Sequence, residues 1–375
     1  MSPIEAGSRD PWWREWPLAL SVLTLTLALL GKGWVTAALG HPVTLIGWLA
    51  ILCGVILTAA IAIVRHADVL AHRLGEPAGT LLLTLAITGL EVSVVGFVMS
   101  TGADKPTLAR DTMFAVVMLV LNGFMGLAML LGGLRHREQS YNLQSANAFL
   151  VMILPLTVLG LVLPNFTRTT PGPTLSTFQM VFLSVMSIGI YAVFLFVQNQ
   201  RHRDFFIAHE EADDAGAAGA DHTSARPTIF HAVMLGLYGL PLVLLAKQMA
   251  APLDALVVKL GAPPALGGFV TAVLVLTPES IAAIRAALAN RLQRSVNILL
   301  GSVLASIGLT IPLVIALSLG TGRMLVLGLD AADAVLLVLT LVTSMLTFSL
   351  PRTNMLFGSV HLLLFFAYLM LIFER

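Results

Sequence analysis

Long apolar runs separated by short polar connections organise this sequence. Runs of about 20 mostly apolar residues are long enough to cross a bilayer as helices. Because backbone polar groups in lipid must be satisfied within a segment, these runs predict helices and not barrel strands. The sequence therefore predicts an all-α polytopic membrane protein with about 11 transmembrane helices. The runs lie at about residues 17–31, 42–64, 78–100, 112–134, 146–164, 176–198, 229–249, 265–287, 296–319, 331–350 and 353–373.

The polar connections divide the chain into segments. Residues 1–41 are expected to form an N-terminal segment with a short, retained first helix, since no small-residue cleavage site follows it. The longest polar connection, residues 199–228, is expected to be an acidic cytoplasmic linker. It separates five runs in residues 42–198 from five runs in residues 229–375.

The two sets of five runs stay in register. Glu91 in the third run and Glu279 in the eighth are 188 residues apart. The polar positions that follow them are 184 residues apart, Arg110 with Arg294 and Asn122 with Ser306. Two tandem copies with an odd number of spans insert with opposite orientations. We therefore predict two inverted five-helix repeats plus an extra N-terminal helix, an arrangement typical of secondary transporters.

Composition and charge narrow the function. Hydrophobic residues make up 57% of the chain and charged residues 11%, with a net charge of +1. These values exclude a soluble globular enzyme and a basic nucleic-acid binder, because soluble domains carry about 25% charged residues. Of the 21 Lys and Arg residues, 13 lie at the N-terminus and in every second connection. This bias predicts a cytoplasmic N-terminus and, with eleven spans, a periplasmic C-terminus.

The two intramembrane glutamates are the candidate transport site. A charge at mid-membrane costs about 2.5–3.5 kcal/mol on insertion scales, so such residues are typical of ion pathways. Thr88 shares a helical face with Glu91, and Thr277 and Pro278 immediately precede Glu279. Proline frees a backbone carbonyl, and oxygen ligands suit hard cations. Small polar residues in the next helices, Asn122 in one repeat and Ser302 and Ser306 in the other, complete the predicted cation and metal ligands.

Competition between protons and cations follows from this chemistry. Burial raises the pKa of a carboxyl group and a bound cation lowers it. A buried pair can therefore hold protons or a cation such as Ca²⁺, Na⁺ or K⁺. If the site opens to alternate sides, this competition is sufficient for antiport. No nucleotide-binding loop is present, and the cycle requires no organic cofactor.

Two polar connections carry further candidates. The connection after the second run is expected to cap and gate one mouth of the pathway, with a metal-binding pair, Asp68 and His72, as a less favoured alternative; its candidate gate residues are His66, Asp68, His72 and Glu76. The acidic linker is either a solvated connection or a cytoplasmic cation or pH sensor. Its candidate regulatory residues are His209, Glu210, Glu211, Asp213, Asp214, Asp221 and His222. His361 and Cys53 are interpreted as packing residues.

Several of these segments resemble a known family. They are residues 64–77, Leu90-Glu-Val-Ser93, Arg110-Asp-Thr112, Thr277-Pro-Glu-Ser280, and residues 301–308 and 361–370. They resemble the cation/proton exchanger branch of the calcium:cation antiporter superfamily, and more narrowly its ChaA type of calcium/proton or sodium-potassium/proton antiporter. The resemblance implies inverted repeats, one essential glutamate in each, and a shared site at Glu91 and Glu279. It also implies the same ligand positions at Asn122, Ser302 and Ser306.

Two positions depart from the family pattern. Thr88 and Leu276 stand where the pattern has asparagine before each glutamate. Fewer amide ligands leave a monovalent-selective sodium-potassium/proton antiporter open as an alternative to calcium export. A passive cation channel is the alternative from another class. The leading prediction is a bacterial inner-membrane antiporter, not an enzyme, whose partners are inorganic cations, protons and lipid.

Overall fold

The chain forms two units, each drawn from both sides of the acidic linker. The computed structural model describes residues 12–31, 33, 40–74, 88–89, 92–93, 96, 106–198, 226–261, 263 and 265–374. The first unit comprises Met1–Leu90 and Ile207–Pro252. The second comprises Glu91–Phe206 and Leu253–Arg375.

In the first unit, a single-turn helix η1 (Trp12–Glu15) leads into α1 (Trp16–Leu30). Helix α1 packs against α3 (Pro42–Leu74), and α10 (Thr228–Lys259) contributes its residues up to Pro252. Helix α3 continues ten residues beyond the predicted apolar run. It does so because buried positions recur at helical spacing through Ile63, His66, Ala67 and Leu70. The candidate gate segment is therefore largely helix and not a loop.

The second unit contains the remaining helices of the described chain. They are α5 (Leu108–Val117), the π-helix η2 (Met118–Phe124), α6 (Met125–His136), α7 (Leu143–Leu161), the short η3 (Leu163–Asn165), α8 (Thr177–Phe196), α11 (Ala265–Leu288), α12 (Leu292–Thr321), α13 (Ala331–Thr347) and α14 (Met355–Phe373). The helices α5, η2 and α6 run on without a break, so they form one span from Leu108 to His136.

Polar caps begin three of these helices where the apolar runs start. The Asn142 side chain accepts from the backbone amides of Gln144 and Ser145 at the start of α7. Ser176 and Gln179 form a reciprocal capping box at the start of α8. The Asn354 side chain accepts from Leu356 at the start of α14. These caps satisfy amides that a helix leaves without partners at its first turn.

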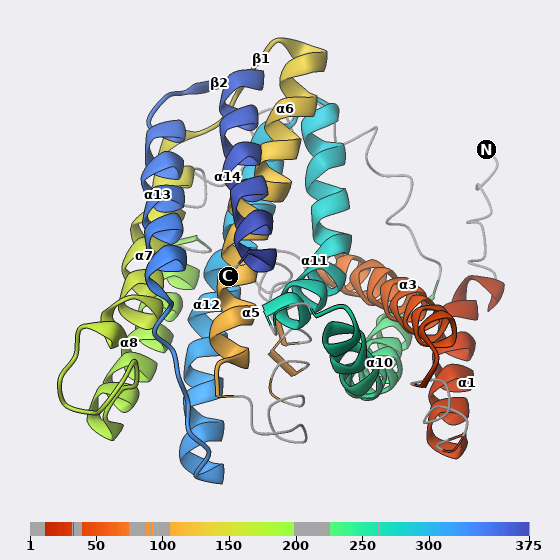
Figure 1. Cartoon of the computed structure of the whole chain (residues 1–375). Coiled ribbons are helices and arrows are strands. Elements are labelled where there is room, and N and C mark those ends of the chain that lie inside the picture. Colours follow the sequence, from red (N-terminus) through yellow and green to blue (C-terminus); the bar gives the residue numbers. More distant parts are fainter. Residues whose placement is uncertain are drawn as a thin grey trace, which may run out of the picture. The chain divides into compact units, whose positions relative to one another are not determined.

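The chain is not purely helical. Strand β1 (Glu138–Ser140) pairs antiparallel with β2 (Arg352–Asn354), with Gln139 opposite Thr353. The strands were not predicted, because three-residue segments in polar connections carry no clear alternation. Strand β1 follows α6 and strand β2 precedes α14, so their pairing holds the end of α6 beside the start of α14. Figure 1 shows both strands at one end of this unit.

Helices from the two halves of the sequence pack against one another in the second unit. Helix α12 packs on α7 and α8, while α14 packs on α6 and η2 and α13 packs on η2. Figure 1 shows α14 lying along α6. One close approach is at Gly126 and Gly358. A Cβ atom at Gly126 would lie 3.1 Å from the Gly358 carbonyl oxygen, so glycine is required for these backbones to meet.

Ten of the eleven predicted apolar runs correspond to described helices. Eight helices of the described residues are long and apolar enough to span a membrane. Helix α13 has 17 residues and α1 has 15, so both are shorter than these eight. The predicted run at residues 78–100 lies mostly outside the described residues.

The Gly126–Gly358 contact predicts a stability effect. In Gly358→Ala, the new methyl group would lie 2.7 Å from the Gly126 carbonyl oxygen, so α14 must shift. We expect a loss of about 1–3 kcal/mol in stability. Gly189→Ala is the matched control, because nothing lies within 4 Å of a Cβ atom there. Thermal unfolding of the detergent-purified variants measures the difference, and equal melting temperatures would contradict the close packing.

Candidate functional site

Glu279 presents a buried carboxylate oxygen in the middle of an apolar helix. It lies on α11, and its Oε2 atom is buried without a hydrogen-bond partner among the described residues. The side chain of Ser302, on α12, hydrogen-bonds to the carboxyl group. Most buried polar atoms have partners, so this oxygen is open to a proton, a cation or a residue outside the described ranges.

The other polar residues of α11 are turned to their own helix. The Thr277 hydroxyl donates to the carbonyl of Val273, and the Ser280 hydroxyl donates to Leu276. Pro278 has no N–H, so it leaves the carbonyl of Leu274 without the usual helical donor. In this conformation the Thr277 hydroxyl hydrogen is used in the bond to Val273, but its oxygen can still accept a hydrogen bond or bind a cation.

Of the predicted α12 ligands, Ser302 reaches Glu279 and Ser306 is buried one turn further along. Ser306 is only 1% exposed. Both serines lie on a helix that packs directly on α11. The structure therefore brings Glu279 and Ser302 together, with Ser306 one helical turn from Ser302 on the same helix.

Asn122 lies in the π-helical turn and is fully buried. Its Nδ2 atom donates to Thr340 Oγ1 at 2.8 Å, and its Oδ1 atom lies 3.0 Å from His361 Nδ1. The sequence interpretation made His361 a packing residue. The structure shows that it also hydrogen-bonds to Asn122, a predicted cation ligand. Sequence separations of 218 and 239 residues gave no signal for these contacts. The sequence feature that could have pointed to His361 was an ionisable residue inside a predicted span.

Several predicted site residues lie outside the described residues. They are Glu91, Glu76 and the acidic-linker residues His209, Glu210, Glu211, Asp213, Asp214, Asp221 and His222. Thr88 is buried and belongs to the first unit. Within the described ranges, no group of three or more His, Cys, Asp or Glu side chains is arranged to hold a metal ion.

The two arginines that aligned the halves occupy different environments. Arg110 is buried, and it donates to the Asp111 carboxylate and to the Gly328 carbonyl, each at 2.9 Å. Arg294 is exposed. The two arginines therefore occupy matching sequence positions in the two halves but have different structural roles.

A second polar cluster lies wholly within the first unit, around the candidate gate residue His66. Its Nδ1 atom lies 2.9 Å from Nδ1 of His231, and its Nε2 atom lies 3.2 Å from the Glu15 carboxylate. The same carboxylate accepts from Arg65 at 2.9 Å and from the Tyr238 hydroxyl at 2.8 Å. Asp68 is half-buried on the same helix. Sequence reasoning found His66 but not Glu15, His231 or Tyr238.

The charge state of Glu15 follows from its partners. Burial alone would raise the pKa of Glu15, but hydrogen bonds from His66 and Tyr238 and the charge of Arg65 outweigh burial and lower the pKa to about 2. Glu15 is therefore ionised throughout the range in which histidine titrates, between about pH 5 and 8. Its stabilising contribution is present above its ordinary pKa of 4.5 and is lost only as the pH falls toward 2.

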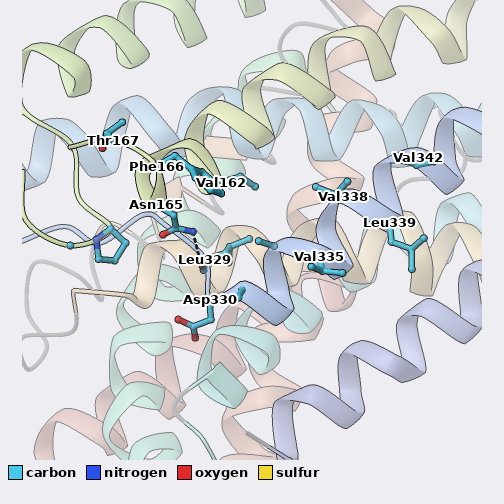
Figure 2. A pocket seen from close by; sticks show the side chains of 14 residues that line it. Val162, Asn165, Phe166, Thr167, Leu329, Asp330, Val335, Val338, Leu339 and Val342 are labelled. Atoms are coloured by element: carbon cyan, nitrogen blue, oxygen red, sulfur yellow. Dashed lines mark hydrogen bonds between the residues drawn. The ribbon is translucent and has the colours of Figure 1, made fainter. Parts of the chain in front are cut away.

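A cavity of 1020 Å³ in the second unit does not include any predicted site residue. Figure 2 shows Val335, Val338 and Val342 of α13 along it, and Asn165 bonded to the Leu329 carbonyl. Its one charged lining residue, Asp330, approaches Arg110 at 3.9 Å. A hard-cation site requires several oxygen ligands. The lining of this cavity is largely aliphatic, so it lacks the oxygen ligands of a hard-cation site.

Comparisons with known proteins agree on one family. The model of the sodium/calcium exchanger protein family matches residues 44–199 and 230–374. The chain is 44% identical to y4hA of Sinorhizobium fredii over 85% of this chain and 86% of that protein. It is 39% identical to the sodium-potassium/proton antiporter ChaA of Escherichia coli, over 96% of both proteins.

Solved structures give the same fold. The structure of native YfkE covers 96% of this chain and 100% of its own, with a TM-score of 0.72 and 17% identity. The H⁺/Ca²⁺ exchanger CAX covers 96% of this chain and 89% of its own, with a TM-score of 0.66 and 17% identity. At these identities the likeness establishes the fold alone.

Proposed function

The chain belongs to the sodium/calcium exchanger protein family, a family of membrane transporters and not of enzymes, and we propose that it exchanges cytoplasmic cations for protons by alternating access. The observation that carries this proposal is the buried Oε2 atom of Glu279, which has no hydrogen-bond partner among the described residues and lies beside Ser302. Proton entry would protonate the site and release the cation. Cation binding would then displace the proton. Glu91 and Glu279 form the shared site in this proposal.

Two inverted repeats are supported by the helix lengths. Helices α3 and α10 have 33 and 32 residues, and the spans Leu108–His136 and α12 have 29 and 30. Helices α7 and α13 have 19 and 17 residues, and α8 and α14 have 20 and 19. The order of these pairs is the order of the proposed repeats. The packing has the same symmetry, because the third helix of each repeat packs on the fourth and fifth helices of the other.

The transported cation follows from ligand chemistry and from the relatives. Carboxylates, hydroxyls and carbonyls are oxygen ligands that accept Ca²⁺, Na⁺ or K⁺. The relative from Escherichia coli is named as a sodium-potassium/proton antiporter, and YfkE is described as a Ca²⁺/H⁺ antiporter. Thr88 and Leu276 replace amide ligands of the family pattern. We therefore propose monovalent export together with calcium export, with monovalent-only exchange as the second candidate.

We propose that the His66 cluster is the cytoplasmic gate of the first unit. The Lys and Arg bias predicts a cytoplasmic N-terminus, so Glu15, the end of α3 and the start of α10 share the cytoplasmic side of a bacterial inner membrane. His66 and His231 join α3 to α10 at this end. Contact between these helices would then close the mouth of the pathway.

Protonation provides a way to open this gate. Nε2 of His66 lies 3.2 Å from Glu15, which only accepts, and 3.4 Å from Nη2 of Arg65, which only donates. The shorter contact, to Glu15, places a hydrogen on Nε2. The short Nδ1–Nδ1 contact then requires one ring to donate and the other to accept. A second proton would leave two N–H groups facing each other at 2.9 Å. The charged groups around the pair are Glu15 and Arg65, with Arg226 over Trp12 and Phe230.

Removing the carboxylates should remove exchange. In Glu91→Gln or Glu279→Gln, the site can neither release a proton nor neutralise a cation, so exchange should fall to the level of vesicles without the protein. The measurement uses inverted, respiration-energised membrane vesicles with a fluorescent reporter of ΔpH, to which calcium, sodium and potassium are added in turn.

The control variant is Glu138→Gln, whose side chain is 59% exposed. It should exchange as the wild type does. Normal exchange in either site variant, at matched membrane abundance, would contradict the shared site. Cation flux without any change in ΔpH would favour a channel.

The gate predicts a change in pH dependence. His231→Asn retains a neutral side-chain donor that cannot take up a proton. We expect its exchange rate to vary less with cytoplasmic-side pH between about pH 5 and 8 than that of the wild type. His41→Asn, at an exposed histidine, is the matched control and should keep the wild-type profile. A His231→Asn profile that coincides with the wild type would rule out the histidine pair as the gate.

A further inference from the structure

We propose that His361 is a positioning residue that fixes the amide oxygen of Asn122 for cation binding. This inference rests on the proposed function and on the prediction from the sequence that Asn122 is a cation ligand. His361 lies on α14 and Asn122 lies on η2, and both side chains are fully buried.

A four-residue chain of hydrogen bonds joins η2 to α13 and α14. The Thr347 hydroxyl lies 3.0 Å from Nε2 of His361, and Nδ1 of His361 lies 3.0 Å from Oδ1 of Asn122. Nδ2 of Asn122 donates to Thr340, whose hydroxyl donates to the Leu336 carbonyl. All four side chains are buried, so the chain is shielded from water.

The direction of each bond is fixed by its neighbours. Because the Thr340 hydroxyl donates to Leu336, its oxygen accepts from Nδ2 of Asn122. The Oδ1 atom of Asn122 therefore faces His361 and can only accept, so Nδ1 of His361 carries the hydrogen. Nε2 then accepts from Thr347 in the neutral ring. A neutral ring with its hydrogen on Nδ1 fits both Asn122 and Thr347, and the imidazole also hydrogen-bonds to the backbone of Leu121, the residue before Asn122.

This arrangement orients a ligand and does not block it. A carbonyl oxygen has two lone pairs, and the bond from His361 uses one. Thr340 and the sulfur of Met118, at 3.7 Å, hold the NH₂ group, so the amide cannot flip. The remaining lone pair therefore has a fixed direction. Partners of this kind hold ligands in place, and their loss typically weakens metal binding about 10–100-fold.

Two backbone features lie at the contact between Asn122 and His361, a π-helical turn and a glycine. The π-helical turn of η2 contains Asn122, and such turns are frequent at functional sites. One turn further on, a Cβ atom at Gly126 would lie 3.1 Å from Cβ of His361. The glycine lets α14 approach closely enough for the imidazole to reach the amide.

The test compares two isosteres of histidine. His361→Asn keeps an N–H donor near the position of Nδ1, whereas His361→Gln keeps one near Nε2 and loses the donor to Asn122. In energised inverted vesicles, we expect His361→Gln to raise the half-saturating cation concentration about tenfold or more. Its maximal rate should stay within about twofold of the wild type, and His361→Asn should restore the wild-type half-saturation.

Each outcome decides a different claim. Wild-type exchange in the same vesicles tests the proposed function, and its absence with every cation overturns both claims. Wild-type exchange with unchanged half-saturation in His361→Gln overturns only the role of His361. Equal weakening in both isosteres, or a fall in maximal rate alone, means a packing role and overturns it too. If His361→Gln fails to reach the membrane, Thr347→Val is the second test, because it removes the hydroxyl that donates to Nε2 and thereby keeps the hydrogen on Nδ1. An unchanged half-saturating cation concentration in Thr347→Val would also overturn the role of His361.

Discussion

A carboxylate in the middle of an apolar helix must be neutralised, because lipid and packed side chains do not solvate its charge. Glu279 has this position, and its Oε2 atom has no partner within the described part of the chain. Two neutralising species fit a site of oxygen atoms, namely a proton and a hard cation. The proposed exchange follows from the mutual exclusion of these two species.

Exchange also requires alternating access, which must come from the arrangement of the helices. A site that chooses between ions becomes an exchanger only when it faces each side in turn. The chain forms two units, and each combines segments from both halves of the sequence. Within the second unit, α12 packs on α7 and α8 while α14 and α13 pack on the span that contains Asn122. This reciprocal packing is what two inverted repeats would produce, and inverted repeats are a common basis of alternating access.

Hydropathy was sufficient for most of the fold, because each span needs about 20 apolar residues and little else in sequence resembles that pattern. It misplaced the end of α3, where Arg65 and Asp68 interrupt the apolar run while the buried face continues through Leu70. The positions of Glu279 and Ser302 inside spans were predictable, since intramembrane polar residues are rare, and their hydrogen bond joins two neighbouring spans. The contacts of His66 with His231 and of His361 with Asn122 were not, because they join residues 165 and 239 positions apart. The π-helical turn at Asn122 has no sequence signature of its own.

The central claim is that one site holds either a proton or a cation, and proton release upon cation binding tests it most directly. Isothermal titration calorimetry of the detergent-purified protein, in two buffers of different ionisation enthalpy, measures this release. If protons and cations share the site, the binding enthalpy depends on the buffer, with protons released as sodium, potassium or calcium binds. Cation binding with the same enthalpy in both buffers, and hence no proton release, would contradict it.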